Sequence, residues 1–232
     1  MTNPYEDLFK TAAQPASVPP VVTPLLQKDS DDPLDDRHQT GKTNLRLIVV
    51  YLAVNAVHTI SLALIFLLLD RAHFLDRWRR TKRQWKQAIG GIVTGEIMVY
   101  IALVVSSVVM ERLGLSTGSE NEATIASMFQ QDQLVLGTLI LTLCVFTPIV
   151  EETIFRKVLF GFFPKKLGAT LPILLSGLIF GLMHVAANGD FLQAIPYVMM
   201  GFVFGYVYWS SGRNIYVVMG VHFLNNFISF LI

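Results

Sequence analysis

Long apolar stretches dominate this chain and decide what it can fold into. Several of them reach the roughly 20 residues that a helix needs to cross a bilayer. Hydrophobic residues make up 53% of the 232 residues and charged residues only 15%, whereas about 25% of a soluble domain is charged. The sequence therefore predicts an all-α, polytopic membrane helix bundle of about six transmembrane helices rather than a soluble domain.

The expected transmembrane spans are separated by short polar breaks. They cover residues 45–69, 88–110, 134–163, 168–187, 191–209 and 215–232. The third span has about 30 residues, more than one crossing requires, so we expect it to tilt or break, with Pro148 as the position of a kink. In the fifth span, Gly201 and Gly205 have the small-xxx-small spacing of a helix-packing face.

The charges between the spans predict their orientation. The loop between residues 70 and 87 carries a cluster of basic side chains: Arg71, Arg77, Arg79, Arg80, Lys82, Arg83 and Lys86. Such clusters stay on the cytoplasmic side of a membrane. The segment 111–133 is polar, its charged residues are acidic except for Arg112, and it is expected on the outer side. With six spans, both termini would lie outside.

The chain divides into three regions by composition. Residues 1–44 are acidic and rich in proline, and their low hydrophobicity predicts a disordered tail. Residues 45–133 hold the N-terminal transmembrane helices and the basic loop, and residues 134–232 hold the remaining spans. Cys144 is the single cysteine, so neither an internal disulfide nor a thiolate metal cluster is possible.

Three charged residues, Glu151, Glu152 and Arg156, lie inside the third span. An ionisable side chain at that depth costs at least ~2.5–3.5 kcal/mol to insert, so it usually faces the bundle interior and serves a function. Glu152 and Arg156 are four residues apart and are expected to pair on one helix face. Glu151 lies about 100° further round the helix and must face another partner.

Polar side chains of two later spans lie at the depth of Glu151. At 1.5 Å per residue, Glu151 is about 20 Å from the cytoplasmic end of its span, and His184 and Asn226 are at a similar depth in theirs. His222 is one turn before Asn226, on the same helix face. Each of these groups by itself is more often a structural contact, but together in one layer of hydrocarbon they indicate a site.

Such a set is compatible with two mechanisms. A carboxylate in a desolvated pocket suits a general base that activates water, while imidazole and amide groups orient the water and stabilise an oxyanion. Alternatively, Glu151, His184 and His222 bind one zinc ion and leave a position for water. The sequence does not separate these versions, and it offers little support for serine or aspartyl intramembrane proteolysis.

Three motifs, in order along the chain, resemble those of the CPBP family, the CAAX-protease and bacteriocin-processing intramembrane proteases, also called Abi or CAAX prenyl protease type 2-like proteins. They are Glu151-Glu152-x-x-x-Arg156, Phe180-x-x-x-His184 and His222-x-x-x-Asn226. The resemblance covers residues 134–232 and implies that this region is a catalytic membrane domain with endopeptidase activity.

The resemblance also implies roles for the motif residues: water activation by Glu151 and His184, oxyanion stabilisation by His222 and Asn226, and structural support by the Glu152–Arg156 ion pair. The family is classed with the metalloproteases, and a metal-free glutamate mechanism is also argued for it, so zinc stays open. We favour the metal-free version.

Family members act on different substrates. Eukaryotic members trim prenylated CAAX proteins, whereas bacterial members are linked to bacteriocin maturation, self-immunity and the processing of membrane proteins. The compact six-helix layout resembles the bacterial members. We therefore expect a multi-pass protease of the cell membrane that meets lipid and a peptide or membrane-protein substrate, and no nucleic acid.

Two other functions compete with proteolysis. A non-catalytic membrane protein of the same fold would act by contact, as an immunity or scaffold partner, and would tolerate the loss of Glu151. A small transporter would use Glu96 in the second span, Glu151 and the histidines as a proton path. We see no internal repeat of the kind that transporters often have. Glu96 is otherwise expected to make a structural polar contact to another helix.

Overall fold

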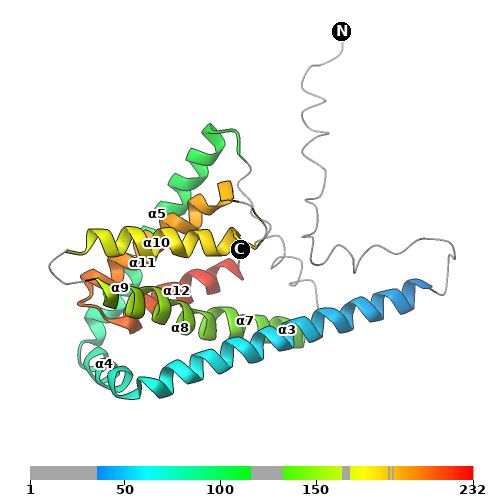
Figure 1. Ribbon diagram of the computed structural model, residues 1–232, viewed down its shortest axis with the longest axis horizontal. Coiled ribbons are helices and arrows are strands. Elements are labelled where there is room, and N and C mark those ends of the chain that lie inside the picture. Colours follow the sequence, from blue (N-terminus) through cyan, green and yellow to red (C-terminus); the bar gives the residue numbers. More distant parts are fainter. Residues whose placement is uncertain (1–35, 116–132, 164–167, 188, 190, 232) are drawn as a thin grey trace, which may run out of the picture.

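The computed structural model describes residues 36–115, 133–163, 168–187, 189 and 191–231. Every regular element in these ranges is helical, which confirms the predicted all-α class. The elements are shown in Figure 1 and are, in order, α3 (Asp36–Leu69), α4 (Arg71–Arg83), α5 (Trp85–Arg112), α7 (Gln133–Ile140), η1 (Leu141–Phe146), α8 (Thr147–Glu152), η2 (Thr153–Val158), α9 (Leu159–Phe162), α10 (Thr170–Val185), η4 (Phe191–Gln193), α11 (Ala194–Ser210) and α12 (Ile215–Ser229).

The helices make this a multi-pass membrane protein, as predicted. Among the described residues, four stretches are long and apolar enough to cross a membrane: Leu52–Leu69, Trp85–Arg112, Leu136–Phe162 and Phe191–Ser210. Helices α10 and α12 are apolar but shorter, with 16 and 15 residues. They span about 24 and 22 Å, less than the roughly 30 Å hydrocarbon core, so the fourth and sixth spans are shorter than predicted.

The prediction of a loop over residues 70–87 is wrong, because most of this basic segment forms helix α4. Arginine and lysine are good helix formers, and one face of α4 packs on the bundle through the buried ring of Phe74. The Phe74 ring meets Tyr216 of α12 edge to face at 6.2 Å, and the Tyr216 hydroxyl donates to the Phe74 carbonyl at 3.1 Å. Tertiary packing thus fixes a helix where charge alone predicted a connection.

The predicted boundary of the disordered tail is also wrong. Helix α3 begins at Asp36, inside the region 1–44 that was assigned to the tail. Pro33 is the last proline before this helix, and no residue that removes a backbone donor interrupts the turns that follow. The rest of the predicted tail, and most of the acidic segment 111–133, lie outside the described residues.

The third span is one helical run, Gln133–Phe162, that contains two wider π-helical segments. These segments, η1 and η2, lie on either side of the short helix α8, which carries Glu151 and Glu152. Pro148 directly follows the first α8 residue, Thr147, so the expected irregularity occurs there as a wide turn. Segments of this type change the direction in which the following side chains point, and they are frequent at functional sites.

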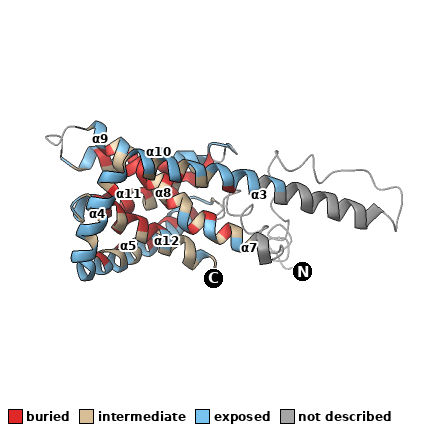
Figure 2. Cartoon of the chain, turned by 90° about the horizontal axis from the view of Figure 1, so that it is seen from below, coloured by how far each residue is buried: buried red, intermediate tan, exposed pale blue. Residues whose placement is uncertain are grey.

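Helix α11 is central to the bundle and contacts α5, α10 and α12. Helix α3 runs along the outer edge beside α7 and α8 (Figure 1). Buried residues concentrate in the interior between these helices (Figure 2), where Phe180, Phe204 and Val218 are almost fully inaccessible. The site described below lies within this interior.

Glycines allow α10 and α11 to pack in backbone contact. A Cβ atom added to Gly201 would lie 2.7 Å from the Cα of Gly177, and one added to Gly205 would lie 3.3 Å from the Cα of Ile173. The predicted packing face of the fifth span is therefore confirmed. The same tight approach holds at Gly181, where a Cβ would lie 2.5 Å from the backbone nitrogen of Val198.

Replacing Gly181 with alanine should therefore destabilise the protein by about 1–3 kcal/mol, because a backbone atom cannot move aside as a side chain would. The matched control is Gly137→Ala in α7, where an added Cβ meets nothing within 4 Å. This change should be neutral or slightly stabilising. Thermal unfolding of both variants in detergent micelles measures the difference, and equal shifts would contradict the packing described here.

Candidate active site

The predicted ion pair between Glu152 and Arg156 is present and fully buried. The Arg156 Nε lies 3.2 Å from the Glu152 Oε2, and both side chains are 0% exposed. The Arg156 Nη2 also donates to the Gly201 carbonyl of α11 at 3.0 Å, and the guanidinium lies 4.9 Å from the centre of the Phe180 ring. Because a buried charge is tolerated only with partners, these contacts hold α8 and η2 against α10 and α11.

Glu152 has a second contact that the sequence did not predict. Its Oε1 lies 2.8 Å from the Nδ1 of His222 on α12, so one carboxylate joins the arginine of its own helix to an imidazole of another. An ionised carboxylate only accepts hydrogen bonds, so Nδ1 carries the hydrogen and donates it. The ring is further fixed by stacking on Phe204, with centroids 4.8 Å apart.

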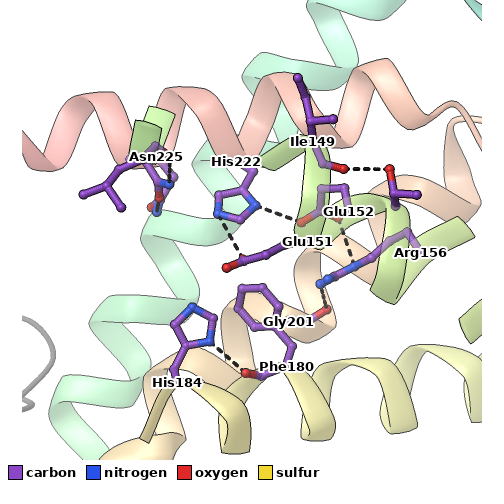
Figure 3. Close-up of polar contacts among 12 residues, drawn as sticks. Ile149, Glu151, Glu152, Arg156, Phe180, His184, Gly201, His222 and Asn225 are labelled. Carbon is purple, nitrogen blue, oxygen red and sulfur yellow. Dashed lines mark hydrogen bonds and ion pairs between the residues drawn. The ribbon is translucent and has the colours of Figure 1, made fainter. Parts of the chain in front are cut away.

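Glu151 faces the other nitrogen of the same imidazole. Its Oε2 lies 3.8 Å from the His222 Nε2, and Figure 3 shows the Glu151 carboxylate directed toward this ring. That separation is longer than a hydrogen bond, and among the described residues the Glu151 Oε2 has no hydrogen-bond partner. The carboxylate is thus held close to the imidazole with an acceptor oxygen available for a proton.

His184 reaches the site from α10. Its Nδ1 lies 2.8 Å from the Phe180 carbonyl one turn earlier, and because a carbonyl only accepts, Nδ1 donates and a neutral ring keeps Nε2 as an acceptor. The ring stacks on Tyr197 of α11 with centroids 4.7 Å apart. In Figure 3 the ring of His184 points toward the carboxylate of Glu151.

Asn226 lies one turn after His222 on α12 and is held by the third span. Its Nδ2 donates to the Leu143 carbonyl of η1 at 2.8 Å, and its Oδ1 accepts from the Nδ2 of Asn225 at 3.3 Å. One hydrogen of its amide is therefore engaged, and the other is free of the Leu143 contact. The structure brings the fixed amide to the same helix face as the imidazole.

Several contacts in the site could not be found from sequence spacing. They are the aromatic rings of Tyr197 and Phe204 and the backbone carbonyls of Leu143 and Gly201. The aromatic residues of 191–209 gave no signal because they are ordinary in an apolar helix, and a carbonyl is present at every residue. Only the packing of α11 against α10 and α12 selects them.

Glu96 of α5 also lies near the site. Its side chain is partly buried and interacts electrostatically with His222. It approaches α12 because Gly95 leaves no side chain between the helices, and a Cβ there would lie 2.6 Å from the Cγ2 of Val221. Among the described residues the Glu96 Oε2 has no hydrogen-bond partner, so the polar contact expected of Glu96 stays a prediction, while its charge acts on His222 from α5.

A zinc site would need Glu151, His184 and His222 to converge on one position. In the described part of the chain, no group of three or more His, Cys, Asp or Glu side chains is placed so as to hold a metal ion. His222 bonds Glu152 through Nδ1, which leaves its Nε2 facing Glu151, and this is also the orientation that a histidine ligand with a carboxylate partner would have. The described side chains thus do not form a complete ligand set, zinc stays the alternative stated above, and we assign no chemical step to a metal.

A cavity of about 430 Å³ lies elsewhere, between α5, α11 and the start of α12. It is lined by residues such as Gly91, Thr94, Tyr206 and Asn214 and by none of the predicted site residues. The open space and the cluster of polar groups therefore do not coincide. We locate the site by the cluster, because buried acids and imidazoles in hydrocarbon require a reason and a cavity between helices does not.

Comparison with known proteins supports the resemblance drawn from the motifs. Residues 133–228 match the family model described as "Type II CAAX prenyl endopeptidase Rce1-like". The chain is also 32% identical over 113 residues to "Putative membrane peptidase YdiL" of Bacillus subtilis (strain 168). That match covers 49% of this chain and 43% of the relative, so the chain spans less than half of the relative's length in the matched region. No solved structure matches this chain.

Replacing Glu152 with glutamine should destabilise the protein by about 3–5 kcal/mol, because it leaves the guanidinium of Arg156 buried without its counter-charge. Glu151→Gln is the matched control one residue away. Its effect should stay within about 1 kcal/mol, because Glu151 is partly exposed and forms only a long contact.

Thermal unfolding and the yield of inserted protein measure the difference. A second variant, Glu152→Gln with Arg156→Met, should recover part of the loss because the unpaired charge is gone. If the single Glu152→Gln variant were as stable as Glu151→Gln, the ion pair would not be the support of the site.

Proposed function

We propose that this chain is an intramembrane endopeptidase that hydrolyses peptide bonds of membrane-associated proteins or peptides, with water activated by Glu151. The observation that carries the proposal is the position of Glu151 against His222, an imidazole that is itself fixed by Glu152. The family match of residues 133–228 and the membrane peptidase among the relatives support it.

In the proposed reaction, Glu151 accepts a proton from a water molecule as the water oxygen adds to the carbonyl carbon of the peptide bond. The Nε2 of His184 accepts the second hydrogen bond of this water and orients it. A base and an orienting group on different helices are useful only if both are rigid. The stacking of His184 on Tyr197 and its bond to the Phe180 carbonyl supply that rigidity.

The addition step places a negative charge on the former carbonyl oxygen. The second amide hydrogen of Asn226 donates to it, and a doubly protonated His222 donates from Nε2 while Nδ1 remains bonded to Glu152. Glu151 then gives its proton to the amine nitrogen as the carbon–nitrogen bond breaks. The products are a carboxylic acid and an amine, the proton of the acid then passes to the amine, and the carboxylate of Glu151 is regenerated.

The substrate belongs to the proposal as well. A peptide must reach Glu151 within the bundle, so the substrate is a membrane-associated chain rather than a soluble protein. Processing of a bacteriocin-type peptide or a role in self-immunity agrees with the CPBP resemblance, and the family description names CAAX prenyl endopeptidases. The alternative is a non-catalytic immunity or scaffold protein of the same fold, in which the polar cluster only stabilises the bundle.

Loss of either Glu151 or His184 should abolish proteolysis while leaving the protein inserted. Wild type, Glu151→Ala and His184→Ala are compared in the native host, with membrane-protein and secreted-peptide fragments followed by mass spectrometry. The control is Glu111→Ala, an exposed carboxylate at the end of α5. We expect the same fragments to disappear in both site variants and to persist in the control.

The protease hypothesis fails if neither site variant changes any fragment while deletion of the whole chain still has a phenotype. The scaffold function then takes its place. Metal dependence is a separate arm, in which isolated membranes are treated with a zinc chelator. We expect fragment formation to continue, and a loss that added zinc restores would replace the metal-free version while leaving the peptidase function intact.

A further inference from the structure

We propose that Pro148 is a positioning residue that fixes Asn226 by leaving the Leu143 carbonyl without a helical donor. The inference deepens the proposed function and rests on it, because it concerns how one oxyanion donor is held. It links the residue three positions before Glu151 to an amide on α12, a helix far away in the sequence.

The first step is the wide turn of η1. The backbone N–H of Thr147 donates to the Thr142 carbonyl, five residues earlier. In an ordinary α-helix the same N–H would donate to Leu143, four residues earlier. The π-type bond thus shifts the pairing by one residue, and the N–H expected at the Leu143 carbonyl becomes that of residue 148.

Residue 148 is a proline and has no N–H to donate. The wide turn and the proline together deprive the Leu143 carbonyl of both possible helical donors. Pro148 is fully buried, and an unsatisfied carbonyl within a membrane protein costs free energy unless another group pairs with it. The Asn226 Nδ2 fills this role at 2.8 Å.

The contact has a consequence for the site because an amide is planar. Once one hydrogen of the Asn226 Nδ2 is bonded to Leu143, the direction of the other is set. The bond from Asn225 to the Asn226 Oδ1 restrains the same plane from the opposite side. The remaining hydrogen is therefore presented in a fixed direction, one turn from His222, as electrostatic preorganisation requires.

Pro148 also connects the position of the Asn226 amide to that of Glu151, the proposed base. Leu143, Pro148 and Glu151 belong to one helical run, so the anchor of the amide and the carboxylate move together. A proline whose only role was to mark an irregular turn would carry no relation to Asn226. If Pro148 only marks an irregular turn, an N–H restored at position 148 leaves Asn226 unaffected. If Pro148 positions Asn226, the restored N–H bonds to the Leu143 carbonyl and releases the Asn226 amide.

The test compares wild type, Pro148→Ala, Asn226→Ala and the double variant by thermal unfolding in nanodiscs. Asn226→Ala alone should lower Tm by roughly 2–4 °C, because the Leu143 carbonyl loses its partner. In the Pro148→Ala background the new N–H can bond to Leu143, so the same change should cost clearly less. Additive shifts would overturn the proposal.

Fragment formation in the host gives the second measurement. Pro148→Ala should lower fragment yield about tenfold or more without lowering Tm, because the amide is released from its anchor while the helix gains a bond. The matched control is Pro172→Ala, also buried, in the first turn of α10, where a missing N–H leaves no carbonyl of that helix unpaired. A wild-type yield in Pro148→Ala would also overturn the proposal.

Two features keep these outcomes decisive. If Pro148→Ala does not insert, Asn226→Leu replaces it, since this change keeps the shape of the side chain but removes the donor. A Tm equal to wild type would then show that the Leu143 carbonyl does not depend on Asn226.

The unfolding measurements do not require activity. Non-additive Tm shifts would therefore support the contact between Asn226 and Leu143 even if Glu151→Ala left every fragment unchanged. In that case only the proposed peptidase function would fail.

Discussion

The buried carboxylate of Glu152 is the contact on which the site depends. It balances the charge of Arg156 and accepts the Nδ1 hydrogen of His222, so it fixes both the helix that carries it and the imidazole of α12. Burying a pair of charges away from water costs free energy, and such a pair is stable only where further hydrogen bonds satisfy its remaining polar atoms. Here the Gly201 carbonyl and the Phe180 ring surround the guanidinium, which extends the constraint to α10 and α11.

Adjacent carboxylates in α8 acquire different environments because a helix turns about 100° per residue. Glu152 points into the bundle and is fully enclosed, whereas the side chain of Glu151 is 22% exposed and faces the Nε2 of the same imidazole. One acid is therefore bound in structural contacts, and the other keeps an oxygen that has no hydrogen-bond partner among the described residues. The wide turn of η1 before α8 changes the direction in which both acids point, and the wide turn of η2 after α8 changes the direction of Arg156.

The N-terminal helices lie outside the matched segment 133–228 but take part in its packing. Helix α5 contacts both α11 and α12, and the close approach at Gly95 and Gly220 needs the absence of side chains there. Glu96 interacts electrostatically with His222 from this position. The first half of the chain therefore takes part in the packing of the site, because α5 contacts α12 and α12 contacts α8, the helix that carries Glu151.

The sequence by itself determined the all-α membrane class, the approximate spans, the Glu152–Arg156 pair and the clustering of Glu151 with His222, because these depend on hydrophobicity, helix periodicity and depth. The tertiary structure decided the rest. The bond from His222 to Glu152, the stacking on Tyr197 and Phe204 and the anchor at Leu143 depend on how each helix is rotated about its axis. Wide turns and a proline alter that rotation locally, and the packing of neighbouring helices selects it, so no periodicity in the sequence encodes it.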